Sequence, residues 1–171
     1  GYSNTGFGVQ SLENTTTANG NAAFGSYAGN KNTTGSSNTA VGANALFSNT
    51  TASYNTAVGY QAGYSNQTGA GSTFIGYQAG YSSAVVSASA YNCFVGLQAG
   101  YYVTTGTRNT ILGSYNGNQG RLDIRTAHNY IMLSDGDGNP RGYFDYSGNF
   151  LVGTTTTNPV GADVNGITLV P

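Results

Sequence analysis

Residues 55–63 read NTAVGYQAG and residues 72–80 read STFIGYQAG, so nearly the same nine residues occur twice at an interval of 17. The pattern extends over most of the chain, because a glycine follows a large apolar residue in seven successive copies. These glycines are Gly8, Gly25, Gly42, Gly59, Gly76, Gly96 and Gly113. Their spacing is 17 residues except for one interval of 20, which places a three-residue insertion around Ser82–Tyr91. An internal repeat of this kind is typical of a solenoid, in which each repeat packs against its neighbours.

The apolar residue before each glycine forms one column of the repeat. Its members are Phe7, Phe24, Val41, Val58, Ile75, Val95 and Leu112. Two positions earlier comes a column of small residues, mostly Thr, and alternate residues of a strand share a face. We therefore expect both columns to face the inside of each coil.

The residue between these two columns should point the opposite way. Its members are Gly6, Ala23, Ala40, Ala57, Phe74, Phe94 and Ile111. They are apolar too, and a strand that is apolar on both faces is normally buried on both. The sequence thus predicts that this face packs against other copies of the chain, most simply around a threefold axis, with Phe74, Phe94 and Ile111 facing the trimer contact.

Three further columns describe the rest of the coil. An Asn column suggests a ladder of amides between coils: Asn4, Asn21, Asn38, Asn55, Ser72, Asn92 and Asn109. An Ala column provides a second, small inward position: Ser11, Ala28, Ala45, Ala62, Ala79, Ala99 and Asn116. The glycine column marks a bend, because only Gly adopts positive φ freely or lets backbone approach backbone without a Cβ.

These columns predict the fold class. Apolar residues do not recur at three and four positions, so there is no helical signal. We expect an all-β protein: a homotrimeric parallel β-solenoid or β-roll of seven coils of about 17 residues. With coils about 4.8 Å apart, the rod would be roughly 30 Å long.

Charge divides the chain into two parts. The 171 residues have a net charge of −1. The only charged side chains in residues 1–107 are Glu13 and Lys31. The junction is expected near Gly117–Gly120, with a repeat β-roll at 1–117 and a smaller antiparallel β region at 118–171. In that region, residues 121–133 resemble a strand, residues 142–154 a hairpin with its turn at 147–149, and residues 166–171 another strand. Since Gly1 opens the chain within a repeat, we expect a piece of a longer protein.

Composition also limits the possible partners. The few Lys and Arg residues are scattered, which argues against nucleic acid, because phosphate binding needs clustered cations. No apolar run is long enough to cross a bilayer, so no membrane insertion is expected. A lone cysteine, Cys93, excludes a disulfide within the chain.

The repeats NTAVGYQAG, STFIGYQAG and NCFVGLQAG resemble those of bacteriophage tail fibres and, more distantly, the N-S-x-A-I-G repeats of trimeric autotransporter adhesin heads. Residues 134–155, SDGDGNPRGYFDYSGNFLVGTT, look like the distal stretch that follows such repeats in many phage tail-fibre proteins. The resemblance implies a homotrimeric, extracellular fibre of the virion, with left-handed rolls lying side by side, which acts as a stiff spacer and host-attachment element. A bacterial adhesin head is an alternative, although the period of 17 is longer than is usual there and no heptad stalk follows.

Candidate chemistry is sparse, and we expect no catalytic, cofactor-binding or metal-binding residues. Asp135 and Asp137 could form a glycosidase pair, but within DGDGN they are better explained as turn residues. The same segment fails the EF-hand pattern, with Pro140 and Tyr146 at the positions that need Gly and a carboxylate. His128 is interpreted as a structural or surface residue.

Aromatic and threonine columns are the remaining candidates. Tyr side chains at the corners of the coils could stack on sugar rings of a host glycan, or could instead fill the corners of the roll: Tyr60, Tyr64, Tyr77, Tyr81 and Tyr101. Adjacent Thr pairs such as Thr33–Thr34 and Thr50–Thr51 leave an ice-binding solenoid as an alternative function. Sequons at Asn14, Asn32, Asn49 and Asn66 are explained by the turn preference of Asn and Thr.

Overall fold

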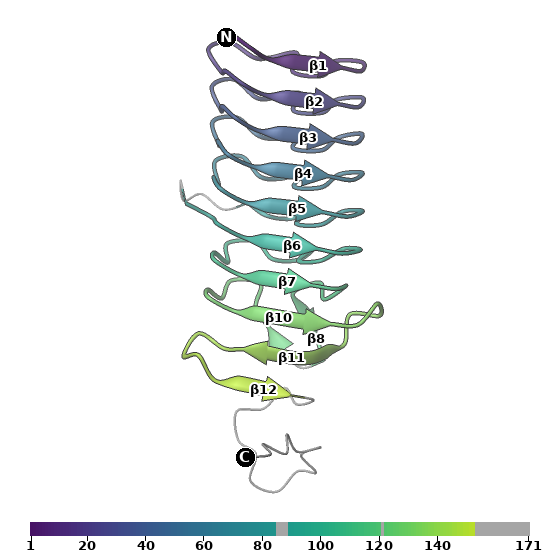
Figure 1. Ribbon diagram of the computed structural model, residues 1–171, viewed down its shortest axis with the longest axis vertical. Helices are drawn as coiled ribbons and strands as arrows, with labels where there is room; N and C mark the ends of the chain where they lie inside the picture. Colours follow the sequence, from purple (N-terminus) through teal and green to yellow (C-terminus); the bar gives the residue numbers. More distant parts are fainter. Residues whose placement is uncertain (85–88, 121, 153–171) are drawn as a thin grey trace, which may run out of the picture.

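The chain winds into a column of stacked coils (Figure 1). The computed structural model describes residues 1–84, 89–120 and 122–152, and all regular elements in these ranges are β-strands. The strands are β1 (Thr5–Phe7), β2 (Ala22–Phe24), β3 (Thr39–Val41), β4 (Thr56–Val58), β5 (Thr73–Ile75), β6 (Cys93–Val95), β7 (Thr110–Leu112), β8 (Asn118–Gln119), β9 (Leu122–Asp123), β10 (Ile131–Ser134), β11 (Pro140–Phe144) and β12 (Phe150–Val152).

Ten of these strands form one sheet in the order β1-β2-β3-β4-β5-β6-β7-β10-β11-β12. Pairing is parallel from β1 through β7 to β10, and antiparallel from β10 to β12, while β8 and β9 form a separate antiparallel pair. The predicted parallel β-solenoid of about seven coils with a small antiparallel sheet is therefore confirmed. Parallel pairing continues past residue 117, because β10 adds to β7 before the antiparallel pairing begins.

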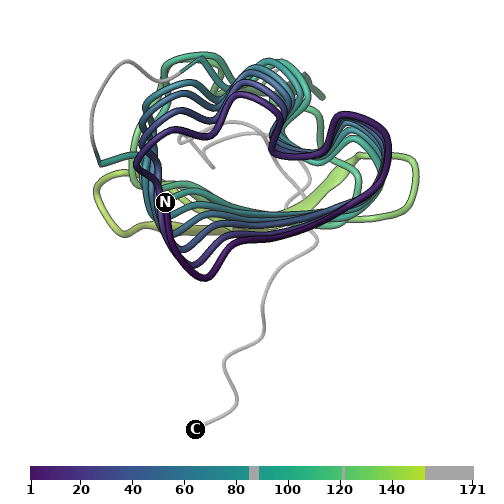
Figure 2. The same cartoon turned by 90° about the horizontal axis from the view of Figure 1, so that it is seen from above.

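Successive coils stack in register. Thr56, Ala57 and Val58 of β4 lie beside Thr73, Phe74 and Ile75 of β5, and the same columns meet at every parallel pair up to β7. Seen along the stack, the coils nearly superpose, with one long smooth side and an opposite side folded into loops (Figure 2). The repeat of the sequence is thus a repeat in space.

The glycine column has the predicted role. Gly59, for example, has φ +135°, and a Cβ there would collide with the backbone carbonyl of Gly76 in the next coil. At Gly25, with φ +138°, an added Cβ would lie 2.6 Å from the carbonyl oxygen of Gly42. Only glycine meets both requirements, positive φ and close approach of backbones.

The predicted assignment of the two strand faces is wrong. Phe74, Phe94 and Ile111 are fully buried in the core of their own chain, so their side chains do not face another chain. The column that was expected inside points outward instead, with exposed fractions of 38% for Ile75 and 43% for Leu112. Since strand side chains alternate, an error of one residue exchanges the two faces.

The interior is filled by large and small residues that fit together within a coil and between neighbouring coils; Leu12, for example, reaches over Gly29 of the next coil. Ala40 faces Leu46 in the coil of β3, whereas Phe74 faces Gly80 in the coil of β5, and all four are core or interior residues. A Cβ on Gly63 would lie 2.6 Å from the Phe74 ring, so the ring occupies the space that a side chain would need. The Ala column is buried as predicted: Ala28, Ala45, Ala62, Ala79 and Ala99.

The Asn column forms the predicted ladder. The Asn38 side chain accepts a hydrogen bond from the Asn55 backbone N–H (2.9 Å) and donates one to the Ala52 carbonyl (2.8 Å). The Asn21 and Asn92 side chains accept in the same way from Asn38 and Asn109 of the following coils. These amides are nearly completely buried, so each coil is joined to the next by directional bonds inside the roll.

The C-terminal hairpins follow the sequence prediction. The turn at 147–149 joins β11 to β12, and the DGDGN turn joins β10 to β11. The segment 121–133 is not one strand, because β9 ends at Asp123 and β10 begins at Ile131. The strand expected at 166–171 lies outside the described residues.

Candidate functional site

The outward side of the ten-stranded sheet carries a row of apolar side chains along the stack. It carries the large residues that precede the glycine column, and several of them are exposed: Phe7, Phe24, Val58, Ile75 and Leu112. Between them lies the column of Thr residues with Ala22 and Cys93. A predominantly parallel sheet is rarely left open to water on one face.

The C-terminal hairpin extends this surface. Ile131 and Leu133 of β10 pair with Thr110 and Leu112 of β7, which places them on the outer face. Phe144 is opposite Ile131 and also opposite Phe150, and the two phenylalanine rings stack with centroids 4.7 Å apart. We call the residues of the two outward columns of β1–β7, together with Ile131, Leu133, Phe144 and Phe150, the outer face.

Charge is absent from the outward columns of β1–β7, which contain only Thr, Ala, Cys, Phe, Val, Ile and Leu. The thiol of Cys93 lies in the Thr column of β6, between Thr73 and Thr110. The outer face is therefore uncharged, ordered by the coil repeat, and marked at one position by a free thiol.

The Tyr columns predicted as glycan contacts are stacked on themselves. The Tyr81 ring lies between Tyr64 and Tyr101, with centroids 5.1 and 4.9 Å away and planes within 10°. Tyr60 and Tyr77 stack in the same manner at 5.5 Å. A ring stacked on both sides, such as Tyr81, has no face open to a sugar, so in this column the geometry favours the interpretation in which the residues fill the corners of the coils. Tyr60 and Tyr77 cover one face of each other.

Three of the four sequon asparagines are buried. Asn32, Asn49 and Asn66 each donate a side-chain hydrogen bond to a carbonyl three residues later, at 2.8, 3.0 and 2.8 Å. Their side chains lie inside the roll and shape its corner. This agrees with the structural explanation of the sequons.

Threonine hydroxyls of the predicted ice-binding column are also used internally. Thr16 donates to the Thr33 carbonyl and Thr33 to the Thr50 carbonyl, both at 2.9 Å, and Thr50 donates to the Gln67 carbonyl at 3.1 Å. The hydroxyl hydrogens of this column therefore connect coils instead of pointing to solvent.

Asp135 and Asp145 cap the two C-terminal turns with their carboxylates. The Asp135 carboxylate accepts hydrogen bonds from the backbone N–H groups of Asp137 (3.0 Å) and Asn139 (2.9 Å) and pairs with Arg141. The hydrogen bonds from Asn139, followed by Arg141, lower the pKa of Asp135 to about 2. Asp145 repeats this arrangement with Ser147 and Asn149, and its pKa is lowered mainly by the Asn149 side chain.

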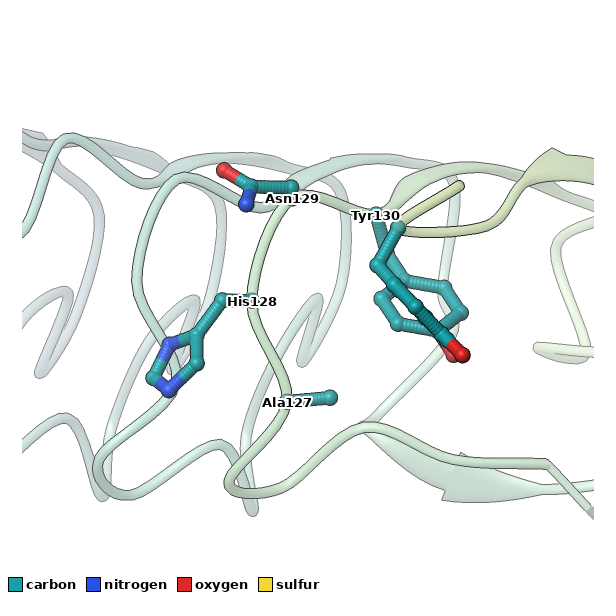
Figure 3. Close-up of a pocket in the computed structure, with 5 residues that line it drawn as sticks. Ala127, His128, Asn129 and Tyr130 are labelled. Atoms are coloured by element: carbon teal, nitrogen blue, oxygen red, sulfur yellow. The ribbon is translucent and has the colours of Figure 1, made fainter. Parts of the chain in front are cut away.

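A pocket of about 400 Å³ lies where the last parallel coil meets the hairpins, lined by Ala127, His128, Asn129, Tyr130 and Tyr146. Figure 3 shows His128 and Tyr130 leaving the 127–130 segment on different sides, with Ala127 between them. The His128 Nδ1 accepts a hydrogen bond from the Thr107 N–H at 3.1 Å, so the proton of the neutral ring lies on Nε2. Burial, and then the nearby Asp145 carboxylate, raise the pKa of Tyr130.

Sequence analysis did not single out Asn129 or Tyr146 as binding residues. Asn129 is the residue before the Asn-ladder position of its coil and has φ +63°, a conformation that Asn tolerates. Tyr146 is 71% exposed and follows Asp145 in the hairpin turn. The signal that could have found them is the DYSGN turn, which repeats the DGDGN turn but adds an aromatic residue.

Within residues 1–84, 89–120 and 122–152, the structure contains no cluster of three or more His, Cys, Asp or Glu side chains that could hold a metal ion. In the same ranges it contains no helix long and apolar enough to span a membrane. Comparisons with protein-family models, with curated proteins and with solved structures find no match to this chain.

Proposed function

We propose that this chain is a structural segment of a homotrimeric viral tail fibre, located on the outside of the virion, where it serves as a stiff spacer and host-attachment element. The observation that carries the proposal is the outer face. It is apolar, uncharged along β1–β7 and continuous with the exposed residues of β10–β12. Contiguous exposed apolar surfaces mark sites of association.

The partner that fits the outer face best is another copy of the same chain. One strand per coil sets a fixed spacing of about 4.8 Å along the stack. A partner can match every coil only if its own surface has the same spacing, and a second copy has it by construction. Cyclic assembly with the axis along the stack also keeps all copies pointing in one direction, as a fibre requires.

Stiffness follows from the bonds between coils. Backbone pairing in register, the buried Asn ladder and the Thr hydroxyls connect each coil to the next at several points around its circumference. Sliding one coil past another would break all of these bonds together. A roll of this kind is suited to hold a binding surface at a distance.

Mass measurement of the assembled protein in solution tests the proposal. We expect three times the mass of one chain, and we expect Cys93 to react slowly with a bulky thiol reagent, because the outer face is covered. Ile75→Lys should give monomers in which Cys93 reacts quickly. Thr51→Lys, which adds the same charge at an exposed loop position away from the sheet, should stay trimeric with protected Cys93.

A stable wild-type monomer with a reactive Cys93 would refute the assembly and would direct attention to the ice-binding alternative. In that case thermal hysteresis is the next measurement. A trimer in which Cys93 reacts at the rate of the unfolded chain would place the contact elsewhere on the roll.

A further inference from the structure

We propose that the pocket formed by Ala127, His128, Asn129, Tyr130 and Tyr146 binds a neutral saccharide, with the Tyr146 ring as the stacking platform. This deepens, and rests on, the proposed role at a host surface. The observations that carry it are the free ring face of Tyr146, the neutral Tyr130 phenol beside it and the hydrogen bonds that hold the backbone of the pocket.

Tyr146 differs from the tyrosines of the coil corners in the freedom of its ring. Its centroid is 6.4 Å from Tyr130 with the planes inclined by 51°, so neither face is covered by a parallel ring. Tyr81, by contrast, is covered on both faces. The apolar face of a pyranose needs an open aromatic face to pack against, and Tyr146 offers one at 71% exposure beside a concave site.

The polar groups of the pocket suit hydroxyls rather than charges. The Tyr130 phenol, next to Tyr146, is neutral and can both donate and accept a hydrogen bond. The His128 ring and the Asn129 amide leave the lining segment on the side away from Tyr130 (Figure 3), and the His128 ring is held there by Thr107. No charged side chain lines the pocket, and the nearby Asp145 carboxylate disfavours an anionic sugar.

The pocket is held by the end of the Asn ladder. The Asn109 side chain donates to the Ala127 carbonyl at 2.8 Å and accepts from the Tyr130 N–H at 2.9 Å, so one buried amide fixes both ends of the lining segment. The Asn129 N–H donates to the Thr107 carbonyl at 3.2 Å. A preformed site loses little conformational entropy on binding. Its volume of about 400 Å³ is within the range of roughly 300–1,000 Å³ that is common for small-molecule sites.

The test is saturation-transfer NMR on the intact, assembled chain with glucose, galactose, N-acetylglucosamine and their short neutral oligosaccharides as probes, and with sialyllactose as the charged counterpart. We expect binding of at least one neutral probe and weaker or no binding of sialyllactose. Tyr146→Ala should weaken binding by about tenfold, the value of one lost aromatic platform. Tyr146→Phe keeps the ring and should retain most of the affinity.

Tyr60→Ala is the matched control, because Tyr60 is also exposed but stacked in a coil corner, and it should leave binding unchanged. Circular dichroism and mass are recorded on the same samples. A trimer that binds none of the neutral probes, or binds them equally after Tyr146→Ala, overturns the pocket assignment and leaves the fibre proposal standing. Sugar binding by a monomeric protein overturns the fibre proposal and leaves the pocket standing.

Discussion

The replacement of Phe74 by alanine tests which strand face is inside. The ring is fully buried, lies 5.8 Å from the Phe94 ring between centroids, and occupies space over Gly63 and Gly80. Removing a buried phenylalanine side chain costs about 3–5 kcal/mol, depending on how far the site can collapse. Collapse is restricted here, because backbone pairing with β4 and β6 fixes the spacing of the coils. We therefore expect a loss of about 4 kcal/mol in the free energy of unfolding.

Denaturant unfolding, followed by circular dichroism at several protein concentrations, measures this loss. Ile75→Ala is the matched control, since its side chain is the next in β5 but 38% exposed in a single chain. It should cost at most about 1–2 kcal/mol in the unfolding of one chain. In an oligomer the denaturation midpoint rises with protein concentration. Ile75→Ala should weaken this concentration dependence, whereas Phe74→Ala should leave it unchanged.

A second change should partly rescue the first. Phe74→Ala with Gly80→Leu recreates the Ala40 and Leu46 pair found two coils earlier, where Leu46 adopts φ +49° without glycine. We expect recovery of roughly half the lost stability, reduced by the 1–2 kcal/mol cost of the left-handed conformation. If Phe74→Ala costs less than about 1 kcal/mol while Ile75→Ala costs more, the assignment of the faces described above is wrong.

Three other predictions concern the bends, the ladder and the turns. Gly59→Ala should cost at least about 3 kcal/mol, whereas Gly136→Ala, where an added Cβ meets nothing within 4 Å, should be nearly neutral in the same denaturation assay. Asn38→Leu should cost about 2–3 kcal/mol by leaving buried backbone groups unpaired, and hydrogen exchange at the Asn55 amide should accelerate. The Asp135 carboxyl should titrate near its pKa of about 2 by NMR. Because this pKa is depressed on folding, the stabilisation of its turn is present above the unfolded-state pKa and is lost as pH falls through about 2; Asp135→Asn should remove that pH dependence.

The period, the bends and the ladder could be predicted because each depends on one residue type at one position. Gly59 needs positive φ and close backbone approach, and Asn38 is placed by a spacing that is constant through four coils. The inside and outside of the strand could not be assigned in this way. Both Phe74 and Ile75 are large and apolar, and Thr73, which shares the face of Ile75, is small enough to fit either inside or outside the roll.

A sequence signal that distinguishes the inner from the outer column lies outside the strand. Leu occurs six residues after the inner column only where the inner residue is small, as in the Ala40 and Leu46 pair, and Phe occurs in the inner column only where that position is Gly, as in the Phe74 and Gly80 pair. Coils that are small at both positions, such as that of Gly63, follow a coil with Leu, whose side chain reaches over them. Two positions that exchange volume in this way share one cavity. The volume exchange involves Phe74 and not Ile75, so it identifies the inner column without coordinates.

Hydrogen bonds and apolar contacts hold the roll together at different positions of the repeat, and this has a consequence for assembly. Buried amides such as Asn38 and Asn55 hold successive coils together by hydrogen bonds, so the stack does not depend on a large apolar core for its register. Small inner residues such as Ala40 leave little apolar surface to bury within one chain. In the first four coils, whose inner residues are Gly or Ala, the large apolar side chains lie on the outer face, where they stabilise the protein only when a partner covers them. Folding of one chain and association between chains thus depend on different columns of the same repeat. For this reason the replacement of Phe74 should lower the free energy of unfolding, whereas the replacement of Ile75 should mainly weaken association.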